Sequence, residues 1–494
     1  MKPLTIKQIL LLIISLAAVF ILVYSPHFNY HLPYHIDEWR HVSEALKITH
    51  GLHNQSLIVT EFGFHLILAS LAKILPLVDI YQFLPAIWAT ITAFVLFWVA
   101  YRKTSCNFYI AILSVLFFAS LKSNVNILGL WFFTPLTFSI PFIFLYFYFF
   151  TEGIEKQKSK YIIFSFFIIV FILLIHSISI TFVIPVLVLY CLINFRKTLK
   201  VWKSLLIFIS LPVIGVAILL YMIWPNIPDL FNFKGYLTVI KFVTVFILNF
   251  GFKFKSGWGV LEYRNSPLEV YSLVGYGLAL LGGIFIFSRR DMLKKYSPYL
   301  LWPAWLIVSI LFYYQLGVSY FSPYQRNLYY LAIGLPLLSA IGLYCLALEL
   351  KNYISTVWLQ KIAIASLLAV VFFLSFQQYY RTPYQFSLYQ VVDTDSYPVL
   401  EFLARLSPTQ VAAAPLLSSA IYPLTGHEPF YSLVFGPMAN KADAEKLFSR
   451  QLCTVKNDII KKYKIKYYLT EQTQNCGWKE IYRNQKYIIY QTNE

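Results

Sequence analysis

The run Tyr-His-Ile-Asp-Glu-Trp-Arg-His-Val-Ser-Glu, at residues 34–44, directly follows the first hydrophobic segment and is unusually rich in ionisable side chains. If a helix begins at Asp37, then Asp37, His41 and Glu44 share one face, because residues three, four and seven apart lie on one side of a helix. A second face carries apolar side chains, namely Trp39, Val42 and Leu46. The pattern predicts an amphipathic helix at a membrane surface, with its carboxylates pointing away from the lipid.

Asp37 and Glu38 form an acidic pair at the start of this predicted helix. A carboxylate in the first turn lies near the positive end of the helix dipole, which favours its ionised form. An ionised carboxylate can accept a proton from a sugar hydroxyl or hold a cation. The same two residues also suit a structural role, as capping and solubilising groups of an interfacial helix. The residue chemistry alone leaves both interpretations open.

The composition indicates an integral membrane protein. Of the 494 residues, 59% are hydrophobic and 13% are charged, which is more apolar sequence than a soluble core requires. The formal net charge of +18 could suggest nucleic acid as a partner. However, Lys and Arg recur in short clusters between apolar runs, as the positive-inside rule expects for cytoplasmic loops. The charge pattern therefore argues for a membrane and against nucleic acid.

Hydropathy predicts about eleven transmembrane helices, with the N-terminus in the cytoplasm, next to Lys2 and Lys7, and the C-terminus outside. The predicted spans are residues 6–24, 80–101, 108–121, 135–150, 161–177, 180–195, 205–224, 268–287, 299–316, 328–348 and 362–376.

The first external loop, residues 25–79, contains a second apolar stretch at residues 58–75 that is interrupted by Glu61, His65 and Lys73. If this stretch spanned the membrane, the basic pair Arg102-Lys103 would lie outside. The charge rule therefore favours an interfacial or re-entrant helix. Glu61 and His65 are four residues apart, so they would share a face and could line one external cavity.

From residue 377 onward the composition is that of a soluble domain. Periodicity predicts helices at residues 397–406, 441–451 and 456–464, strands at 411–414 and 465–470, and a hairpin at 479–482 and 487–491. We therefore expect a transmembrane catalytic region at residues 1–376 and a small extracytoplasmic α/β domain at residues 377–494. Cys453 and Cys476 lie in this domain and could form a disulfide in an oxidising compartment.

Three features resemble the GT-C superfamily of membrane glycosyltransferases that use polyprenyl-phosphate sugars, such as mannosyl- and aminoarabinose transferases. They are the Asp37-Glu38 pair in an Asp-Glu-x-x-His setting, the apolar stretch at residues 58–75, and the run Ser-Pro-Tyr-Gln-Arg-Asn-Leu-Tyr-Tyr at residues 322–330, which is similar to an external Pro-x-x-Arg element. The strand at 465–470 is also similar to the periplasmic domain of such proteins. Residues 60–65 depart from the Pro-Pro-x-Tyr turn of many relatives, which leaves the donor and acceptor class open.

The resemblance implies a hexosyl- or pentosyltransferase in the plasma membrane. It would transfer a sugar from a polyprenyl phosphate to a lipid, glycan or protein acceptor on the outer face, by inverting displacement. Such a reaction needs a base for the acceptor and a positive group for the departing phosphate. We expect Asp37 to be the base, beside His41 on the same face, and Glu38 to be an orienting group or an alternative base.

Arg326 is the predicted phosphate ligand, because a planar guanidinium matches phosphate oxygens. It would also suit an arginine that only reaches to the membrane interface. Further substrate-binding candidates are His41, Glu61, His65, Lys253, Lys255 and Arg264, of which the last three also fit as solvated loop charges.

The sequence identifies no cofactor, although His35, Asp37, Glu38 and His41 could bind a divalent metal ion, because carboxylate and imidazole are usual ligands. Two alternative functions make different predictions. A transporter or flippase of lipid-linked saccharides would place charges in the middle of the spans, where the sequence has almost none. A noncatalytic envelope scaffold would leave the clustered acidic and histidine side chains at residues 37–41 without a purpose.

Overall fold

The computed structural model describes residues 3–52, 58–123, 128–210, 213, 252–254, 266–320, 324–377, 390–431, 438–449 and 451–492. The chain divides into two compact units that alternate along the sequence. The first, called here the membrane unit, comprises residues 1–25, 86–131 and 135–381. The second, the α/β unit, comprises residues 26–85, 132–134 and 382–494. Residues 26–85, which include most of the predicted external loop, thus belong to the same unit as the C-terminal residues. The predicted boundary at residue 377 stays a prediction.

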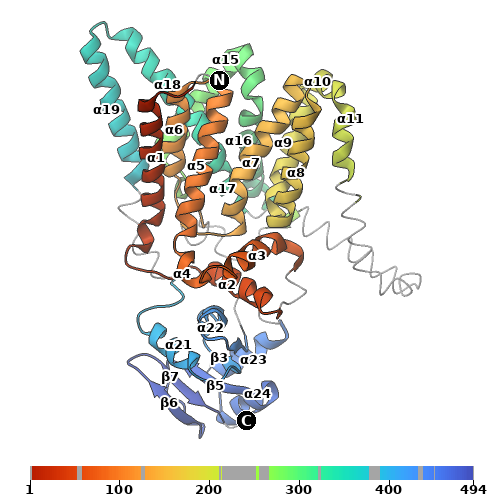
Figure 1. Cartoon of the computed structure of the whole chain (residues 1–494), viewed down its shortest axis with the longest axis vertical. Coiled ribbons are helices and arrows are strands. Elements are labelled where there is room, and N and C mark those ends of the chain that lie inside the picture. The colour runs from red at the N-terminus through yellow and green to blue at the C-terminus, as the bar shows by residue number, and fades with distance from the viewer. Residues whose placement is uncertain are drawn as a thin grey trace. The chain divides into compact units, whose positions relative to one another are not determined.

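Apolar helices make up most of the membrane unit (Figure 1). They are α1 (Ile6–Tyr24), α5 (Leu84–Lys103), α6 (Phe108–Ala119), α7 (Pro135–Lys156), α8 (Ser159–Ile175), α9 (Ile178–Ile193), α15 (Leu273–Ser288), α16 (Arg290–Leu316), α17 (Tyr324–Gly334), α18 (Pro336–Tyr353) and α19 (Val357–Phe376). Short elements complete it: α10 (Phe195–Lys200), α11 (Trp202–Leu205), η3 (Leu206–Ile209), η7 (Pro267–Glu269), and the antiparallel strands β1 (Phe252–Phe254) and β2 (Val318–Tyr320).

Within the described residues, six helical stretches are long and apolar enough to cross a membrane: Ile6–His27, Leu84–Lys103, Pro135–Lys156, Tyr296–Leu316, Tyr324–Tyr353 and Val357–Phe376. Shorter apolar helices coincide with four more of the predicted spans, at Phe108–Ala119, Ser159–Ile175, Ile178–Ile193 and Leu273–Ser288. The remaining predicted span, residues 205–224, lies mostly outside the described residues. The chain is therefore a polytopic helical membrane protein, as predicted.

The predicted span at residues 328–348 is two helices, α17 and α18, which meet at Pro336. Pro336 occupies the first turn of α18, where its missing N–H is not needed, but it cannot continue the hydrogen bonds of α17. Beyond this break α18 crosses α15 closely, because a Cβ on Gly282 would collide with the carbonyl oxygen of Leu338, and one on Gly342 with that of Leu278. Small residues permit this approach of two membrane helices.

The α/β unit combines the first loop with a five-stranded sheet. Its helical elements are η1 (Ser25–His27), α2 (Ile36–Thr49), α3 (Ile58–Ala72), α4 (Leu77–Tyr81), α21 (Ser396–Ala404), α22 (Ser418–Thr425), α23 (Met438–Phe448) and α24 (Cys453–Tyr463). The strands are β3 (Gln410–Ala412), β4 (Glu428–Pro429), β5 (Ile465–Thr470), β6 (Lys479–Arg483) and β7 (Ile488–Gln491), in the order β4-β3-β5-β7-β6. β4, β3 and β5 are parallel, and β7 runs antiparallel to β5 and β6. The predicted helices and hairpin are present, whereas α22 and β4 were not predicted.

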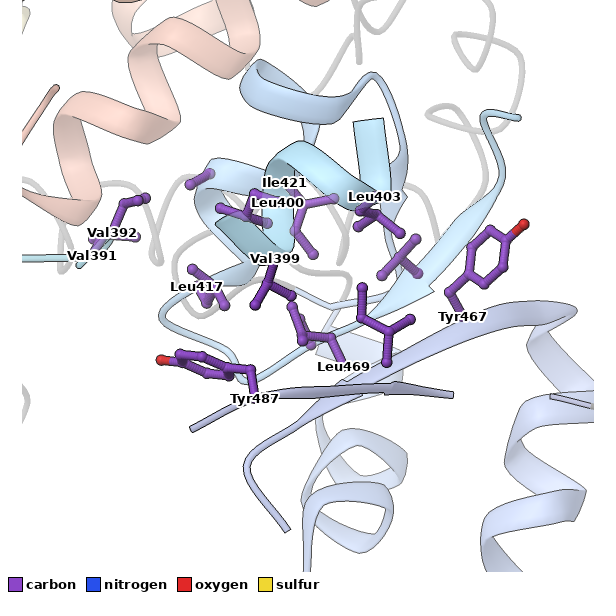
Figure 2. Close-up of a cluster of buried hydrophobic side chains, with 14 of the residues drawn as sticks. Val391, Val392, Val399, Leu400, Leu403, Leu417, Ile421, Tyr467, Leu469 and Tyr487 are labelled. Carbon is purple, nitrogen blue, oxygen red and sulfur yellow. The ribbon is translucent and has the colours of Figure 1, made fainter. Parts of the chain in front are cut away.

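The sheet carries a core on each face, because successive side chains of a strand point to opposite sides. Tyr467 and Leu469 of β5 pack against α21 and α22, as Figure 2 shows. Tyr468, between them in sequence, belongs to the other core, with residues of α23 and α24. The unit therefore has three layers, helix on sheet on helix.

Trp39 of α2 is fully buried in the core that contains α21 and α22. Its neighbours in that core include Val391 and Val392, just before α21. The prediction that the Trp39 face of the helix lies on lipid is therefore wrong. The apolar face of α2 finds its partner in the C-terminal part of the chain.

Cys453 and Cys476 form a disulfide, with their Cα atoms 5.1 Å apart. The bond joins the first turn of α24 to the loop before β6. The pairing that the sequence left open is thus present.

Candidate functional site

The candidate site is built on the first turn of α2. The helix begins at Ile36, one residue before the predicted start, and its N-cap is His35. The Nδ1 atom of His35 accepts the backbone N–H of Asp37 at 3.2 Å. Glu38 reaches back to accept the N–H of His35 at 3.2 Å. This reciprocal pair is a capping box, which satisfies backbone donors that the helix itself leaves unpaired.

Glu38 is completely buried and accepts three backbone N–H groups. The donors are Tyr34 at 3.0 Å and His35 at 3.2 Å, both to Oε2, and Phe133 at 2.9 Å to Oε1. Burial raises the pKa of the Glu38 carboxyl to about 7, although the three N–H donors oppose this rise. Because both oxygens are engaged inside the protein, Glu38 orients the start of α2, and it is less suited to meet a substrate.

Asp37 is the member of the acidic pair that reaches solvent, with its side chain 25% exposed. One of its oxygens lies 3.6 Å from Nδ1 of His35. The same Nδ1 accepts the backbone N–H of Asp37, so His35 contacts both the backbone and the side chain of Asp37. Asp37 therefore presents a carboxyl group to solvent, and its role as the base stays a prediction.

A cluster of His41, Glu61 and His65, called here the His-Glu cluster, joins α2 to α3. Nδ1 of His41 lies 2.9 Å from Nε2 of His65 and 4.0 Å from a Glu61 oxygen. Both imidazoles are almost fully buried, and Glu61 sits at a kink in α3, with φ −142° and ψ 21°. Arg40 pairs with the same Glu61 oxygen. Burial, with a smaller contribution from Arg40, lowers the pKa of His65 to about 3, so this imidazole is neutral.

The three ligand atoms of the His-Glu cluster lie within 4.8 Å of one another, close enough to hold a metal ion. Within the described residues this set replaces the predicted one of His35, Asp37, Glu38 and His41. The side chains of Glu38 and His35 accept hydrogen bonds from backbone N–H groups, and they do not lie with His41 in a metal-binding arrangement. Glu61 and His65 both approach His41. That they line one external cavity stays a prediction.

Arg326 lies on α17 of the membrane unit and is partly buried. It comes one helical turn before Tyr330, whose hydroxyl is 2.8 Å from the Ser179 hydroxyl. Ser179 in turn contacts His176 at 2.7 Å and Ser139 at 2.8 Å. This buried polar network joins the beginnings of α7 and α9 to α17.

Three of the predicted substrate-binding residues, Lys253, Lys255 and Arg264, have side chains outside the described part of the structure. Lys253 lies in β1, of which the backbone alone is described, and Lys255 and Arg264 lie outside the described residues.

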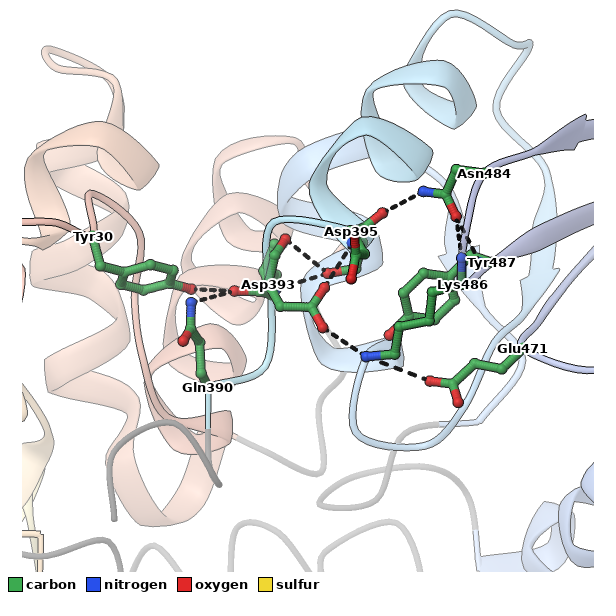
Figure 3. A network of polar contacts seen from close by, with 10 residues as sticks. Tyr30, Gln390, Asp393, Asp395, Glu471, Asn484, Lys486 and Tyr487 are labelled. Carbon is green, nitrogen blue, oxygen red and sulfur yellow. Dashed lines mark hydrogen bonds and ion pairs between the residues drawn. The ribbon is translucent and has the colours of Figure 1, made fainter. Parts of the chain in front are cut away.

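Sequence reasoning missed the C-terminal residues that support the start of α2. The N–H of Val391 donates to the carbonyl of Tyr34 at 3.2 Å, and the Tyr30 hydroxyl donates to the carbonyl of Val392 at 2.9 Å. The next residue, Asp393, pairs with Lys486 at 2.7 Å, as Figure 3 shows. The contacts of Val391 and Val392 with residues 30–34 join parts of the chain more than 350 positions apart, so no local pattern signals them.

No protein-family model matches the chain, and no curated protein matches it by sequence. Solved structures do match. The oligosaccharyltransferase of Archaeoglobus fulgidus, in complex with Zn and sulfate, has a TM-score of 0.59 and 13% identity, over 93% of this chain and 68% of that one. The same organism's AglB, with an inhibitory peptide and a dolichol-phosphate, has a TM-score of 0.55 and 12% identity, over 94% and 69%. ArnT from Cupriavidus metallidurans, bound to undecaprenyl phosphate, has a TM-score of 0.55 and 12% identity, over 97% of both chains.

The chain has the GT-C fold. At these identities the likeness establishes the architecture, so the predicted resemblance to GT-C proteins is confirmed at the level of fold. Within the GT-C fold, the roles of Asp37, Glu38 and Arg326 stay predictions.

Proposed function

We propose that the protein is a glycosyltransferase that moves a hexose or pentose from a polyprenyl phosphate to a lipid, glycan or protein acceptor. The observation that carries the proposal is the acidic pair at the start of α2, in which Glu38 is locked in place and Asp37 reaches solvent. The fold supports it, because AglB and ArnT share that fold and have been solved with dolichol-phosphate and undecaprenyl phosphate, respectively.

In the proposed reaction Asp37 takes the proton of the acceptor hydroxyl while the acceptor oxygen attacks the anomeric carbon. The bond between that carbon and the phosphate oxygen breaks, and the polyprenyl phosphate leaves with the electron pair. One carboxylate suffices for such a direct displacement, which inverts the anomeric centre. Glu38 acts as a positioning residue, since it fixes the turn that carries Asp37.

Arg326 is the proposed ligand of the departing phosphate, because its charge and planar shape match the oxygens. Lys253, Lys255 and Arg264 are secondary candidates for the same role. His41, Glu61 and His65 are proposed to lie near the acceptor and to form the donor set for a divalent ion, and no step of sugar transfer is assigned to the ion.

The proposed location is the plasma membrane, with the N-terminus in the cytoplasm and the α/β unit outside. The disulfide between Cys453 and Cys476 supports this orientation, because such bonds persist in oxidising compartments and are rare in the cytosol. A polyprenyl-phosphate donor on the outer face would then meet Asp37 on the same side.

The test is sugar transfer by the purified protein from a panel of polyprenyl-phosphate mannose, glucose and aminoarabinose donors. We expect Asp37→Asn to lower turnover by about 10²–10⁴-fold, the usual contribution of a general base. Asp79→Asn, a carboxylate on α4 of the same unit, is the matched control and should keep full turnover. Undiminished transfer by Asp37→Asn would remove Asp37 from the mechanism. Movement of a lipid-linked saccharide across vesicles without glycosidic bond formation would favour transport instead.

A further inference from the structure

Two imidazoles and one carboxylate meet between α2 and α3 in an arrangement that suits a metal ion. In a tetrahedral zinc site the Zn–N bonds are about 2.0–2.1 Å, so two ligating nitrogens lie ~3.3 Å apart. The Nδ1 of His41 and the Nε2 of His65 are separated by 2.9 Å. The nearest Glu61 oxygen is 4.0 Å from His41. Shifts of less than an ångström would therefore bring all three atoms to bonding distance of one ion.

The donor types favour zinc over other common divalent ions. Imidazole nitrogen is a good ligand for zinc, whereas magnesium and calcium prefer sites made of oxygen atoms. Two histidines and one glutamate also supply three ligands, which leaves a fourth position for water or for an oxygen of a bound molecule. Because both imidazoles are almost fully buried, their positions are set by the packing of α2 on α3.

Arg40 is the natural competitor for such an ion. Its guanidinium pairs with the same Glu61 oxygen that lies nearest to His41. A dication and a guanidinium cannot share that oxygen at close range, because like charges a few ångströms apart repel strongly in a partly buried setting. Metal binding would therefore require Arg40 to swing away from Glu61.

We propose that His41, Glu61 and His65 bind one Zn²⁺ ion in competition with Arg40. The bound ion would tie α2 to α3 one helical turn after Asp37 and would fix the helix that carries it. The zinc site shares no ligand with the Asp37-Glu38 pair. It rests on the donor set named in the proposed function, but zinc binding requires no sugar or lipid, so its measurement is distinct from that of glycosyl transfer.

The test is zinc binding by the full-length protein, purified in detergent without metal and with any affinity tag removed. The protein is titrated with Zn²⁺ alone, and the measurements are zinc per chain by elemental analysis and the melting temperature. We expect one zinc per chain and a higher melting temperature for the wild type. His41→Ala and His65→Ala should lose both effects. His50→Ala, which removes an exposed histidine at the end of the same helix, should keep them.

Arg40→Gln separates zinc binding from a purely structural hydrogen-bonded cluster. This variant keeps all three donors, so it also serves if the alanine variants fold poorly. We expect it to bind zinc about tenfold more tightly or better, since the competing charge is gone. The proposal is overturned if the wild type retains no zinc at micromolar free metal, if His65→Ala retains as much as the wild type, or if Arg40→Gln binds zinc more weakly.

Discussion

The backbone N–H of Phe133 donates a hydrogen bond to the Glu38 carboxylate at 2.9 Å. Phe133 belongs to a three-residue segment that the α/β unit takes from between α6 and α7. Through this bond, and through its bonds to Tyr34 and His35, Glu38 holds three backbone N–H groups from two segments of the chain at one buried point. The position of Asp37 at the start of α2 therefore depends on the adjacent Glu38, whose carboxylate oxygens are buried.

Glu38→Gln should lower the melting temperature. An amide has one acceptor oxygen where a carboxylate has two, so glutamine can satisfy the donors on one side of Glu38 and leaves the other side without a partner. A buried N–H without a partner costs about 1–3 kcal/mol. Thermal unfolding followed by tryptophan fluorescence measures the loss, and Glu401→Gln, on the surface of α21, should leave the melting temperature unchanged.

The same variant should also change the pH dependence of stability. Burial raises the pKa of Glu38 from its usual 4.5 to about 7, so the folded state binds this proton more tightly than the unfolded state. The stabilising contribution is complete below pH 4.5 and is lost as the pH rises through 7. A shift of this size corresponds to about 3 kcal/mol. A wild-type stability that rises over this range relative to Glu38→Gln would contradict the assignment.

Arg326→Gln should weaken use of the lipid donor. A hydrogen bond to a charged group is worth about 1.5–3 kcal/mol, so we expect the KM for the polyprenyl-phosphate sugar to rise about 10–100-fold. Arg326→Lys keeps the positive charge but loses the planar guanidinium, so its KM should lie between the KM of the wild type and that of Arg326→Gln. Arg289→Gln, at the end of α15, is the control for loss of a membrane-unit arginine. Equal donor KM values in all four proteins would argue that Arg326 makes no phosphate contact.

Loss of the disulfide should destabilise the α/β unit. Cys453 and Cys476 are 23 positions apart, and closing a loop of this size is worth about 3 kcal/mol in the chain-entropy model. The serine variant of either cysteine should therefore melt earlier, whereas Cys345→Ser removes a free cysteine and should not change the melting temperature. Labelling of intact cells with an impermeant maleimide after mild reduction tests the orientation, since cysteines in the cytoplasm would stay unlabelled.

Trp39→Ala should be among the most damaging changes in α2. Removing a fully buried tryptophan costs about 3–5 kcal/mol, because a cavity remains in the core. Trp358→Ala removes a tryptophan that is 61% exposed on α19 and should have little effect on unfolding. A mild effect of Trp39→Ala would mean that α2 is not held by the C-terminal core.

Local signals in the sequence predict the helices and strands well. Residues 6–24 form α1 as expected, because a long apolar run predicts a helix without reference to distant residues. β5 also has its predicted bounds, since its pattern is likewise local. The start of α2 was also close, since its capping box is contained within residues 35–38.

The sequence could not assign the partners of the side chains in α2. Periodicity alone predicts that Glu44 faces solvent and that Trp39 faces lipid. Both side chains are buried, because residues distant in sequence pack against them. Similarly, the pairing of His41 with His65 depends on how α2 packs on α3, and the burial of Glu38 depends on Phe133, which lies 95 positions away. Helical periodicity states which residues share a face, but it does not state what covers that face.

The hydrogen bond from Val391 to the carbonyl of Tyr34 has a consequence for the life of the newly made protein. Ribosomes synthesise the acidic stretch among the first fifty residues, but its support arrives with the last quarter of the chain. A nascent or prematurely terminated polypeptide would hold Asp37 without Val391, Val392 or the core around Trp39. Correct placement of Asp37 should therefore require the complete α/β unit, and a fragment that ends before Val391 should lack it.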